Sequence, residues 1–225
     1  DVVAASASSS AFVDGLTGAE RARLLVRRSG SLEFEHDLVR TAVLDGVDEE
    51  AMRELHRQAL TAVSAARPTD VLRLLGHAEG AGDAVSAATY ALAAGTDALD
   101  QSASRTAERR FTRALELAEQ LGDTHLRRLA LAGRIRARDR LAERTGQSDD
   151  VTALTALAAS GDDVARRDAL RHEAEYRFAV GDYAGSFDSV LRAVGGPLDQ
   201  ADVGGHVGAE LMRVASVALR ELGRY

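Results

Sequence analysis

Four Gly-Asp pairs divide the chain beyond residue 80, and each separates two stretches in which apolar residues recur at helical spacing. The pairs are Gly82-Asp83, Gly122-Asp123, Gly161-Asp162 and Gly181-Asp182. Glycine takes the left-handed conformation that ends a helix without steric cost, and an aspartate side chain caps the first turn of the next helix. The pattern therefore predicts a succession of helical hairpins rather than a sheet.

Small residues recur along this region at Gly95, Gly133 and Ala174, with spacings of 38 and 41 residues. When Gly95 takes the small-residue position of a tetratricopeptide repeat, Phe111 falls on the aromatic position 16 residues downstream. Both spacings exceed the roughly 34 residues of an ideal repeat, so we expect degenerate repeats with lengthened helices. The sequence predicts an all-α fold in which residues 67–225 form an α-solenoid of tetratricopeptide-like hairpins. A helical bundle without repeats is the alternative.

Composition limits the partners of such a fold. The net charge is −7, which disfavours binding to nucleic acids and to anionic membranes, so neither is an expected partner. All 28 basic residues are arginine, a bias that a genome rich in G and C produces without selection for phosphate binding. The absence of cysteine excludes disulfides and thiolate metal sites and is typical of a cytoplasmic protein. Without lysine, the phosphate-binding loop of ATPases cannot form here.

The first part of the chain has a different pattern. We expect a linker or domain edge over residues 1–15, because alanine and serine are abundant there. Thr17 is a good N-cap residue and predicts a helix that runs to about Arg28. Residues 32–35 alternate apolar with polar side chains, which is typical of a strand.

Two further helices are expected before the repeats begin. The first holds residues 36–44, and Asp48 caps the second, which continues to about Ala66. The segment 67–70 contains a proline and breaks the helical pattern. We therefore predict a small module over residues 16–66 and a domain boundary directly after it.

A local motif indicates what this module is. Residues 34–40 read Phe-Glu-His-Asp-Leu-Val-Arg, and residues 53–56 read Arg-Glu-Leu-His. This pattern resembles the end of the winged-helix module in large signal-transduction ATPases, especially LuxR-family regulators of the maltose-activator type. In those proteins an array of helical repeats follows. The resemblance implies a winged-helix-like module over residues 16–66, with a nucleotide-binding domain upstream and a helix-turn-helix domain downstream in the parent protein.

The resemblance also implies a role for His36. The matching histidine of these ATPases contacts a phosphate of bound ADP, so ATP or ADP is the cofactor implied for the parent protein and none is expected in this chain alone. The alternative is that His36 caps its helix or bonds a neighbouring residue. For His56 we expect a structural hydrogen bond between helices.

Five residues are predicted to contact a partner. In tetratricopeptide arrays the first helix of each pair lines the concave surface. By the register above, its inward positions are Arg127, Arg134 and Arg138 in the middle repeat and Arg171 and Glu175 in the later one. The expected partner is another protein or a small-molecule inducer, and an oligomer is possible.

The stretch 127–144 is locally basic, with arginines at positions 127, 128, 134, 136, 138, 140 and 144. Arg134 and Arg138 share one helix face, and Arg136 and Arg140 share another. A solvated helix with local ion pairs is one interpretation, and a groove for an acidic ligand or partner is the other. No aromatic residue lies in the stretch, so a nucleic-acid surface is not expected.

The chain shows no catalytic or metal-ligand pattern. Its histidines are scattered, and His172 begins His-Glu-Ala-Glu-Tyr, which is not the zinc motif His-Glu-x-x-His. We therefore expect a non-catalytic, partner- or inducer-binding segment of a bacterial ATP-dependent transcriptional regulator, a piece of a longer chain. The rival expectation is a helical-repeat interaction scaffold from a kinase, a cyclase-like protein or an adaptor, with no link to nucleotides.

Overall fold

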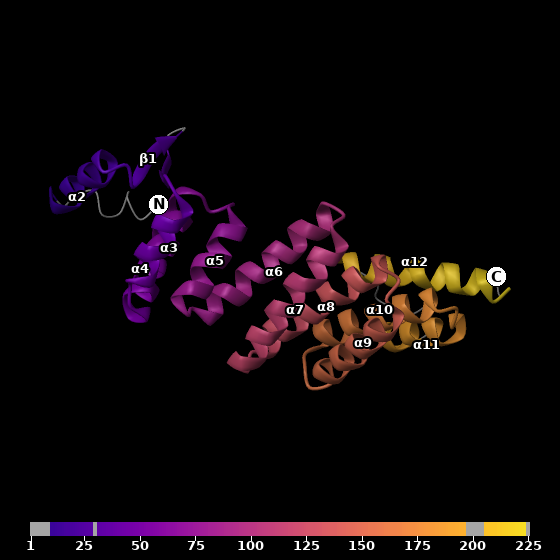
Figure 1. Ribbon diagram of the computed structural model, residues 1–225. Helices are drawn as coiled ribbons and strands as arrows, with labels where there is room; N and C mark the ends of the chain where they lie inside the picture. The colour runs from indigo at the N-terminus through magenta and orange to yellow at the C-terminus, as the bar shows by residue number, and fades with distance from the viewer. Residues whose placement is uncertain (1–9, 29–30, 197–204, 224–225) are drawn as a thin grey trace. The chain divides into compact units, whose positions relative to one another are not determined.

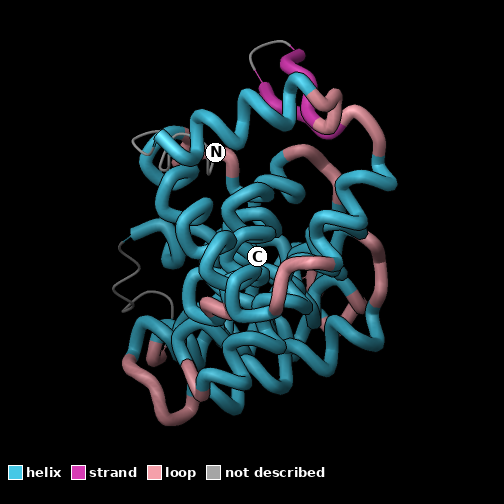
Figure 2. Tube along the Cα trace, turned by 60° about the vertical axis from the view of Figure 1, so that its left-hand side comes forward, coloured by secondary structure: helices cyan, strands magenta, loops and turns pink. Residues whose placement is uncertain are grey.

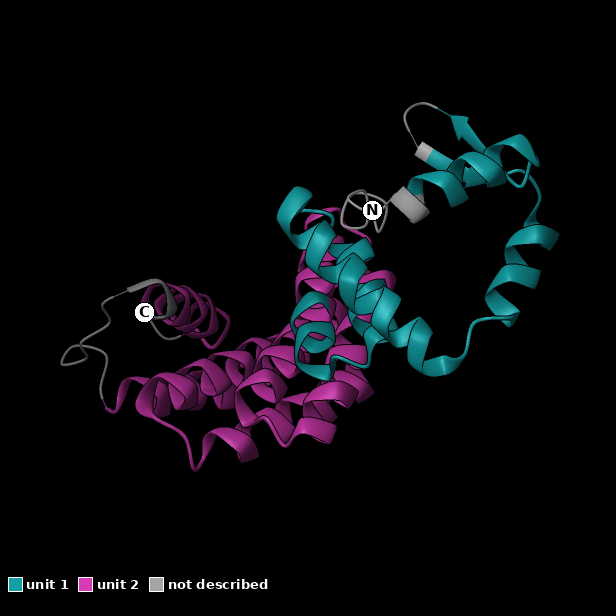
Figure 3. Ribbon diagram, turned by 90° about the vertical axis from the view of Figure 1, so that its left-hand side faces the viewer, with its two compact units in different colours: residues 1–90 teal, residues 91–225 magenta. Residues whose placement is uncertain are grey.

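The computed structural model describes residues 10–28, 31–196 and 205–223. Helices account for most of these residues, and one two-stranded sheet lies near the N-terminus (Figure 2). The all-α prediction is therefore confirmed. The chain divides into two compact units, residues 1–90 and residues 91–225, which are coloured separately in Figure 3. The division falls inside helix α6 (Ala84–Asp100).

Unit 1 begins with a helix and a hairpin. Helix α2 (Ser10–Arg21) leads into strand β1 (Leu25–Arg28), which pairs with strand β2 (Ser31–Phe34) in antiparallel register. Leu25 lies opposite Phe34, so two large apolar side chains of the hairpin are cross-strand partners. The strand predicted at residues 32–35 is present, one residue earlier than expected.

The helix predicted from Thr17 to Arg28 is wrong at both ends. Thr17 lies inside α2, where its hydroxyl donates to the carbonyl of Val13 at 2.8 Å instead of capping a helix start. Arg23 adopts a φ of 54°, which ends the helical run, and the residues after it pair with β2 instead of continuing the helix. Residues 10–15, predicted as linker, belong to α2, whereas residues 1–9 lie outside the described part of the chain.

The remaining helices of unit 1 match the prediction closely. They are α3 (Asp37–Asp45), α4 (Glu49–Ala66) and α5 (Val71–Ala81). The carboxylate of Asp48 accepts the backbone N–H of Ala51 at 2.8 Å, as a capping residue should. Helix α4 packs against α5 across the segment 67–70, and the compact units divide after residue 90 rather than at the predicted boundary.

Unit 2 is a stack of helices that pack in chain order (Figure 1). After the end of α6 they are α7 (Ser104–Leu121), α8 (Thr124–Arg140), α9 (Arg144–Ala158), α10 (Asp163–Ala179), α11 (Tyr183–Val194) and α12 (Gly205–Glu221). Each contacts the next, and α10 also contacts both α8 and α12. Helices α8, α10 and α12 therefore lie side by side, and α9 and α11 alternate with them. This alternation is typical of a helical repeat.

The predicted capping steps form, with one exception. All four aspartates accept a backbone N–H three residues ahead: Asp83 at 3.0 Å, Asp123 at 2.9 Å, Asp162 at 2.7 Å and Asp182 at 2.9 Å. Three of the glycines adopt left-handed φ values: Gly82 at 71°, Gly122 at 65° and Gly181 at 83°. Gly161 does not, because α9 already ends at Ala158 and its C-cap residue, Ala159, is in the right-handed conformation.

Residues other than glycine take the left-handed conformation after two of the longer helices. Ser102 and Ala142 take φ values of 59° and 54° in the turns after α6 and α8. Left-handed conformations cost free energy for residues with a Cβ, so these turns are held by the packing of the helices they join. The basic stretch 127–144 is consequently not one helix, since α8 ends at Arg140 and α9 begins at Arg144.

The predicted small-residue positions pack around one aromatic ring. The side chain of Phe111 on α7 is 1% exposed. A Cβ atom at Gly95 would lie 2.7 Å from the ring, and one at Gly133 would lie 2.3 Å from it. Glycine at both positions is therefore what allows α6 and α8 to approach the ring from two sides. In the next repeat Ala174 is fully buried, and its carbonyl accepts a hydrogen bond from the Ser186 hydroxyl at 2.8 Å.

Replacing Gly133 by alanine tests this contact. Alanine normally stabilises a helix interior relative to glycine by about 0.5–1 kcal/mol, and Gly76→Ala on α5 should do so, because nothing lies within 4 Å of its added Cβ. Gly133→Ala should instead lower the free energy of unfolding by about 1–3 kcal/mol, since the ring must move. Urea unfolding followed by circular dichroism measures both. Equal stabilisation by the two substitutions would contradict the close packing.

Helices α4 and α5 meet through two histidines. The Nδ1 atoms of His56 and His77 lie 3.2 Å apart, which confirms the interhelical contact expected for His56. Gly80 leaves room for the pair, because a Cβ there would lie 2.5 Å from the His56 ring. Burial lowers the pKa of His77, and the charges of His56 and Arg73 lower it further. The folded chain therefore disfavours the state in which both histidines of the contact are protonated.

The contact should make unit 1 sensitive to acid. The pKa of His77 in the folded chain lies below its ordinary value of 6.5. The stability that neutral His77 contributes is therefore complete above about pH 6.5 and is lost as the pH falls through the pKa of the folded state. Thermal unfolding should show a lower Tm at about pH 5.5 than at about pH 7.5. His77→Gln should reduce this dependence, whereas His125→Gln, at an exposed position on α8, should keep it. If the Tm of His77→Gln depends on pH as strongly as that of the unmodified protein, the histidine pair is not the cause of the acid sensitivity.

Candidate functional site

A pocket of about 390 Å³ opens in unit 2 along helices α8, α10 and α12. Its apolar wall includes Ile135 from α8, Phe178 from α10, and Val214 and Val217 from α12. These are the helices that lie side by side in the stack, so the pocket lies on the face where alternate helices meet. A mostly apolar hollow with a few polar groups is the usual form of a small-molecule site.

Charged side chains line the rest of the pocket: Arg136, Asp139 and Arg140 from α8, Arg171 and Glu175 from α10, and Arg213 from α12. The α8 residues follow from helical geometry, because positions three and four apart share a face. Arg136 and Arg140 thus face the pocket together, one helical turn apart. Four guanidinium and two carboxylate groups meet there.

Arg171 is held by carboxylates of its own helix. Its Nη1 donates to Glu175 at 2.9 Å, and its Nη2 donates to Asp168 at 2.8 Å. Burial by itself lowers the pKa of Arg171, but the two carboxylates outweigh it and leave that pKa raised. The guanidinium therefore stays charged at the edge of the pocket.

A buried histidine lies beneath this pair. His172 is 1% exposed, and its Nε2 lies 2.9 Å from the Nη2 of Arg171. Arginine is always a donor, so Nε2 must accept in this contact, which places the ring proton on Nδ1. That proton faces Glu175, whose Oε2 lies 3.5 Å from Nδ1, long for a hydrogen bond. Burial raises the pKa of Glu175, but His172 and Arg171 together lower it more.

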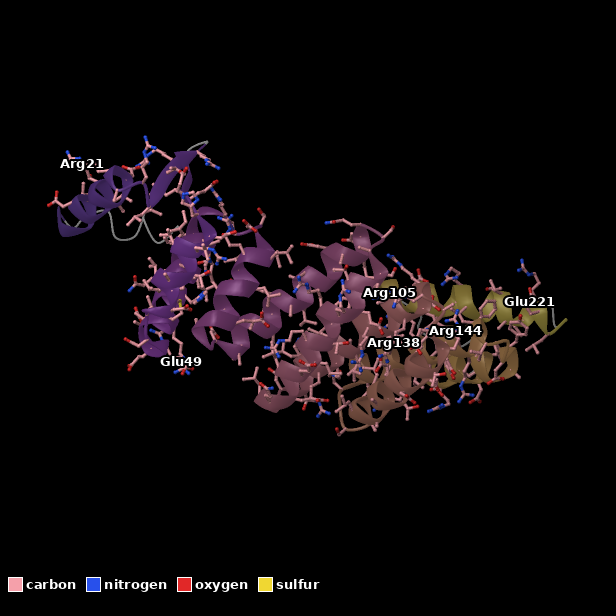
Figure 4. All side chains as sticks on the ribbon, in the orientation of Figure 1. Arg21, Glu49, Arg105, Arg138, Arg144 and Glu221 are labelled. Atoms are coloured by element: carbon pink, nitrogen blue, oxygen red, sulfur yellow. The ribbon has the colours of Figure 1, made fainter. Side chains whose placement is uncertain are left out.

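Two other arginines of α8 are committed to a buried cluster. Arg134 forms a bidentate pair with Asp150 of α9, at 2.9 and 2.6 Å. Arg138 donates to the same carboxylate at 3.0 Å and to Glu108 of α7 at 3.0 Å. The side chains of Asp150, Arg134 and Arg138 are only 3%, 14% and 18% exposed. The cluster joins three consecutive helices, and Figure 4 labels Arg138.

The predicted partner residues therefore separate into groups. Arg171 and Glu175 lie at the pocket, as their register suggested. Arg134 and Arg138 instead form the internal cluster, because their face of α8 is turned toward α7 and α9. Arg127 does not line the pocket, and its Nη2 lies 3.9 Å from the carboxylate of Glu119.

The repeat register did not predict the pocket residues of α8. Arg136 and Arg140 share a face in the sequence, but spacing alone does not say which face turns toward a neighbouring helix. Arg213 gave no signal, because α12 carries no repeat register of its own. Contact between α10 and α12 is what brings it to the pocket.

His36 lies away from these residues in the chain, in unit 1. It is the N-cap residue of α3, in extended conformation, and its exposed side chain makes no capping hydrogen bond. The alternative that His36 caps its helix with its side chain is therefore excluded.

Across the described residues, no group of three or more histidine, aspartate or glutamate side chains is placed to hold a metal ion. Within the same residues, no helix is both long enough and apolar enough to span a membrane. No model of a known protein family matches the sequence, and no curated protein matches it either.

The buried cluster allows a stability prediction. Asp150→Ala should lower the free energy of unfolding by about 3–5 kcal/mol, since it leaves two largely buried guanidiniums without their shared carboxylate. Asp163→Ala removes an exposed partner of Arg166 and should cost at most about 1 kcal/mol. Chemical unfolding of the two variants in parallel measures the difference. Similar small losses in both would show that the cluster is solvated.

Proposed function

We propose that this chain is the regulatory, ligand-binding segment of a bacterial ATP-dependent transcriptional regulator of the LuxR-family, maltose-activator type, and is not catalytic by itself. The observation that carries the proposal is the pocket built from α8, α10 and α12. These helices take the place of the first helices of tetratricopeptide-like repeats, the ones expected to line a binding surface. Arg171 and Glu175 are the predicted contacts that lie there.

The first part of the chain supports the same proposal. A helix, an antiparallel hairpin and two further helices follow one another over residues 10–66, an order compatible with the end of a winged-helix-like module. Helix α3 has no buried residue, and Leu38 is 84% exposed. An uncovered apolar side chain on a short helix is suited to contact with another domain of the parent protein.

His36 would supply the link to a nucleotide. Its imidazole is exposed at the start of α3, where backbone N–H groups and the helix dipole favour an anion. ADP, when bound to an upstream domain, would supply the phosphate charge. His36 would donate a ring N–H to that phosphate and so hold unit 1 against the nucleotide domain. Asp37 beside it opposes anion binding, so the nucleotide domain must contribute most of the affinity.

Regulation then requires coupling between the two sites. A ligand shifts a conformational equilibrium only as far as its affinity differs between the two states. The pocket ligand would favour the state in which His36 and the phosphate are apart. By reciprocity, ADP would weaken binding of that ligand.

Calorimetry with ADP tests the proposal. The 225-residue chain should give no measurable binding, whereas the natural protein that includes the sequence encoded upstream of Asp1 should bind ADP. In that longer protein, His36→Ala should weaken ADP binding about tenfold, the loss of one charge-assisted hydrogen bond. His125→Ala, which removes an exposed histidine of unit 2, should leave it unchanged.

Two outcomes would contradict the proposal. Full ADP affinity in His36→Ala would remove the role of this histidine. A longer protein without any nucleotide binding would favour the rival function, a helical-repeat scaffold from a kinase, cyclase-like or adaptor protein.

A further inference from the structure

We infer that the pocket along α8, α10 and α12 binds a small amphipathic anion, a carboxylate or phosphate group attached to an apolar body. The inference deepens the proposed function and rests on it in one respect, since it takes this pocket to be the ligand site. It rests on the charged side chains of the pocket, because the carboxylates are paired within the described chain and two of the guanidiniums are not.

Both carboxylates of the pocket are already engaged. Asp139 accepts from Arg144 at 2.6 Å, and Glu175 accepts from Arg171 at 2.9 Å. Neither is a free counterion for a cationic ligand. Arg213 is likewise paired, with Glu210 at 2.9 Å, and is exposed at the rim.

Two guanidiniums remain without a carboxylate. Arg140 donates through Nη1 to the backbone carbonyl of Leu99, which fixes the side chain and leaves its charge uncompensated. Arg136 is exposed and forms no ion pair or hydrogen bond with any part of the chain that the structure describes. The two lie one turn apart on the pocket face of α8. A fixed and a free guanidinium at this spacing suit the oxygens of one anionic group.

The other side of the pocket is unsuited to an anion. On α10, Arg171 is shared by Asp168 and Glu175, so that side carries surplus negative charge. Phe178 and the α12 valines Val214 and Val217 offer apolar surface instead. The ligand should therefore place its anionic group toward α8 and its apolar body toward α10 and α12.

The size of the pocket favours a small molecule over a protein segment. Ligand pockets usually measure about 300–1,000 Å³, and this one is near the lower limit at about 390 Å³. A short acyl chain with its head group has suitable dimensions. A folded partner would need a wider surface than this hollow provides.

Four probes below their micellar concentrations separate charge from apolar contact. Octanoate and octyl phosphate carry both features, 1-octanol carries only the chain, and acetate carries only the charge. Calorimetry with the 225-residue chain should show binding of at least one of the first two. That probe should bind at least about tenfold more tightly than 1-octanol or acetate, and added salt should weaken it. Binding of octanoate alone, of octyl phosphate alone or of both identifies the head group and supports the inference.

Matched substitutions assign the binding to α8. Arg136→Gln should weaken the binding probe about fivefold to tenfold without loss of stability, since the side chain has no partner to lose. Arg136→Gln with Arg140→Gln should weaken it further. The control is Arg105→Gln with Arg109→Gln, two exposed arginines with the same spacing on α7; Figure 4 labels Arg105. Circular dichroism confirms that each variant is folded.

The inference fails if 1-octanol binds as tightly as the anions, if neither anion binds, or if Arg136→Gln binds them with unchanged affinity. These failures leave ADP binding through His36 untouched, so the proposed function can survive them. Conversely, anion binding together with full ADP affinity in His36→Ala would keep the ligand site and reject the regulator.

Discussion

The approach of two glycines to one aromatic ring sets the helix spacing on which unit 2 depends. Gly95 and Gly133 are 38 residues apart in the chain, yet both lie against Phe111, from α6 and from α8. A side chain at either position would separate the helices by the width of a methyl group. Close packing at this crossing fixes how α8 lies on α7, and every later helix of the stack is placed on α8 in turn. The repeat is thus propagated through contacts between neighbours rather than around one central core.

The packing of α8 against its neighbours gives its arginines two different roles. A helix repeats every 3.6 residues, so arginines at alternate positions point to two faces. The face of Arg134 and Arg138 meets Asp150 and becomes part of the interior, where the carboxylate is shared between two cations. The face of Arg136 and Arg140 meets the hollow beside α10 and keeps its charge available. The ion pairs expected for the basic stretch are therefore present, but they join helices in the interior instead of lying on a solvated helix. The opposite face lines the pocket proposed for an acidic ligand.

Unit 1 is held together differently. Its hairpin pairs Leu25 with Phe34, and α4 and α5 meet through His56 and His77 with Gly80 leaving space for the rings. Apolar residues of α3 stay uncovered. Unit 1 has a polar, titratable contact between helices and one helix without buried residues. It is therefore better suited to local rearrangement than the helices of unit 2, which pack closely at alanine and glycine.

The sequence by itself determined where most helices begin and end, because capping depends on a few adjacent residues: Asp48, Asp123 and Asp182 cap as their spacing predicts. It also determined the small-residue crossings, since Gly95 and Gly133 recur with the repeat. It did not determine strand β1, because its residues were predicted to be helical and form a strand only by pairing with β2. It also did not determine the turns at Ser102 and Ala142, which are held by the packing of the helices they join. Which arginines of α8 line the pocket was likewise decided only by the tertiary structure. A helix turns every side chain to a definite face, but only a neighbouring helix makes that face a core or a pocket.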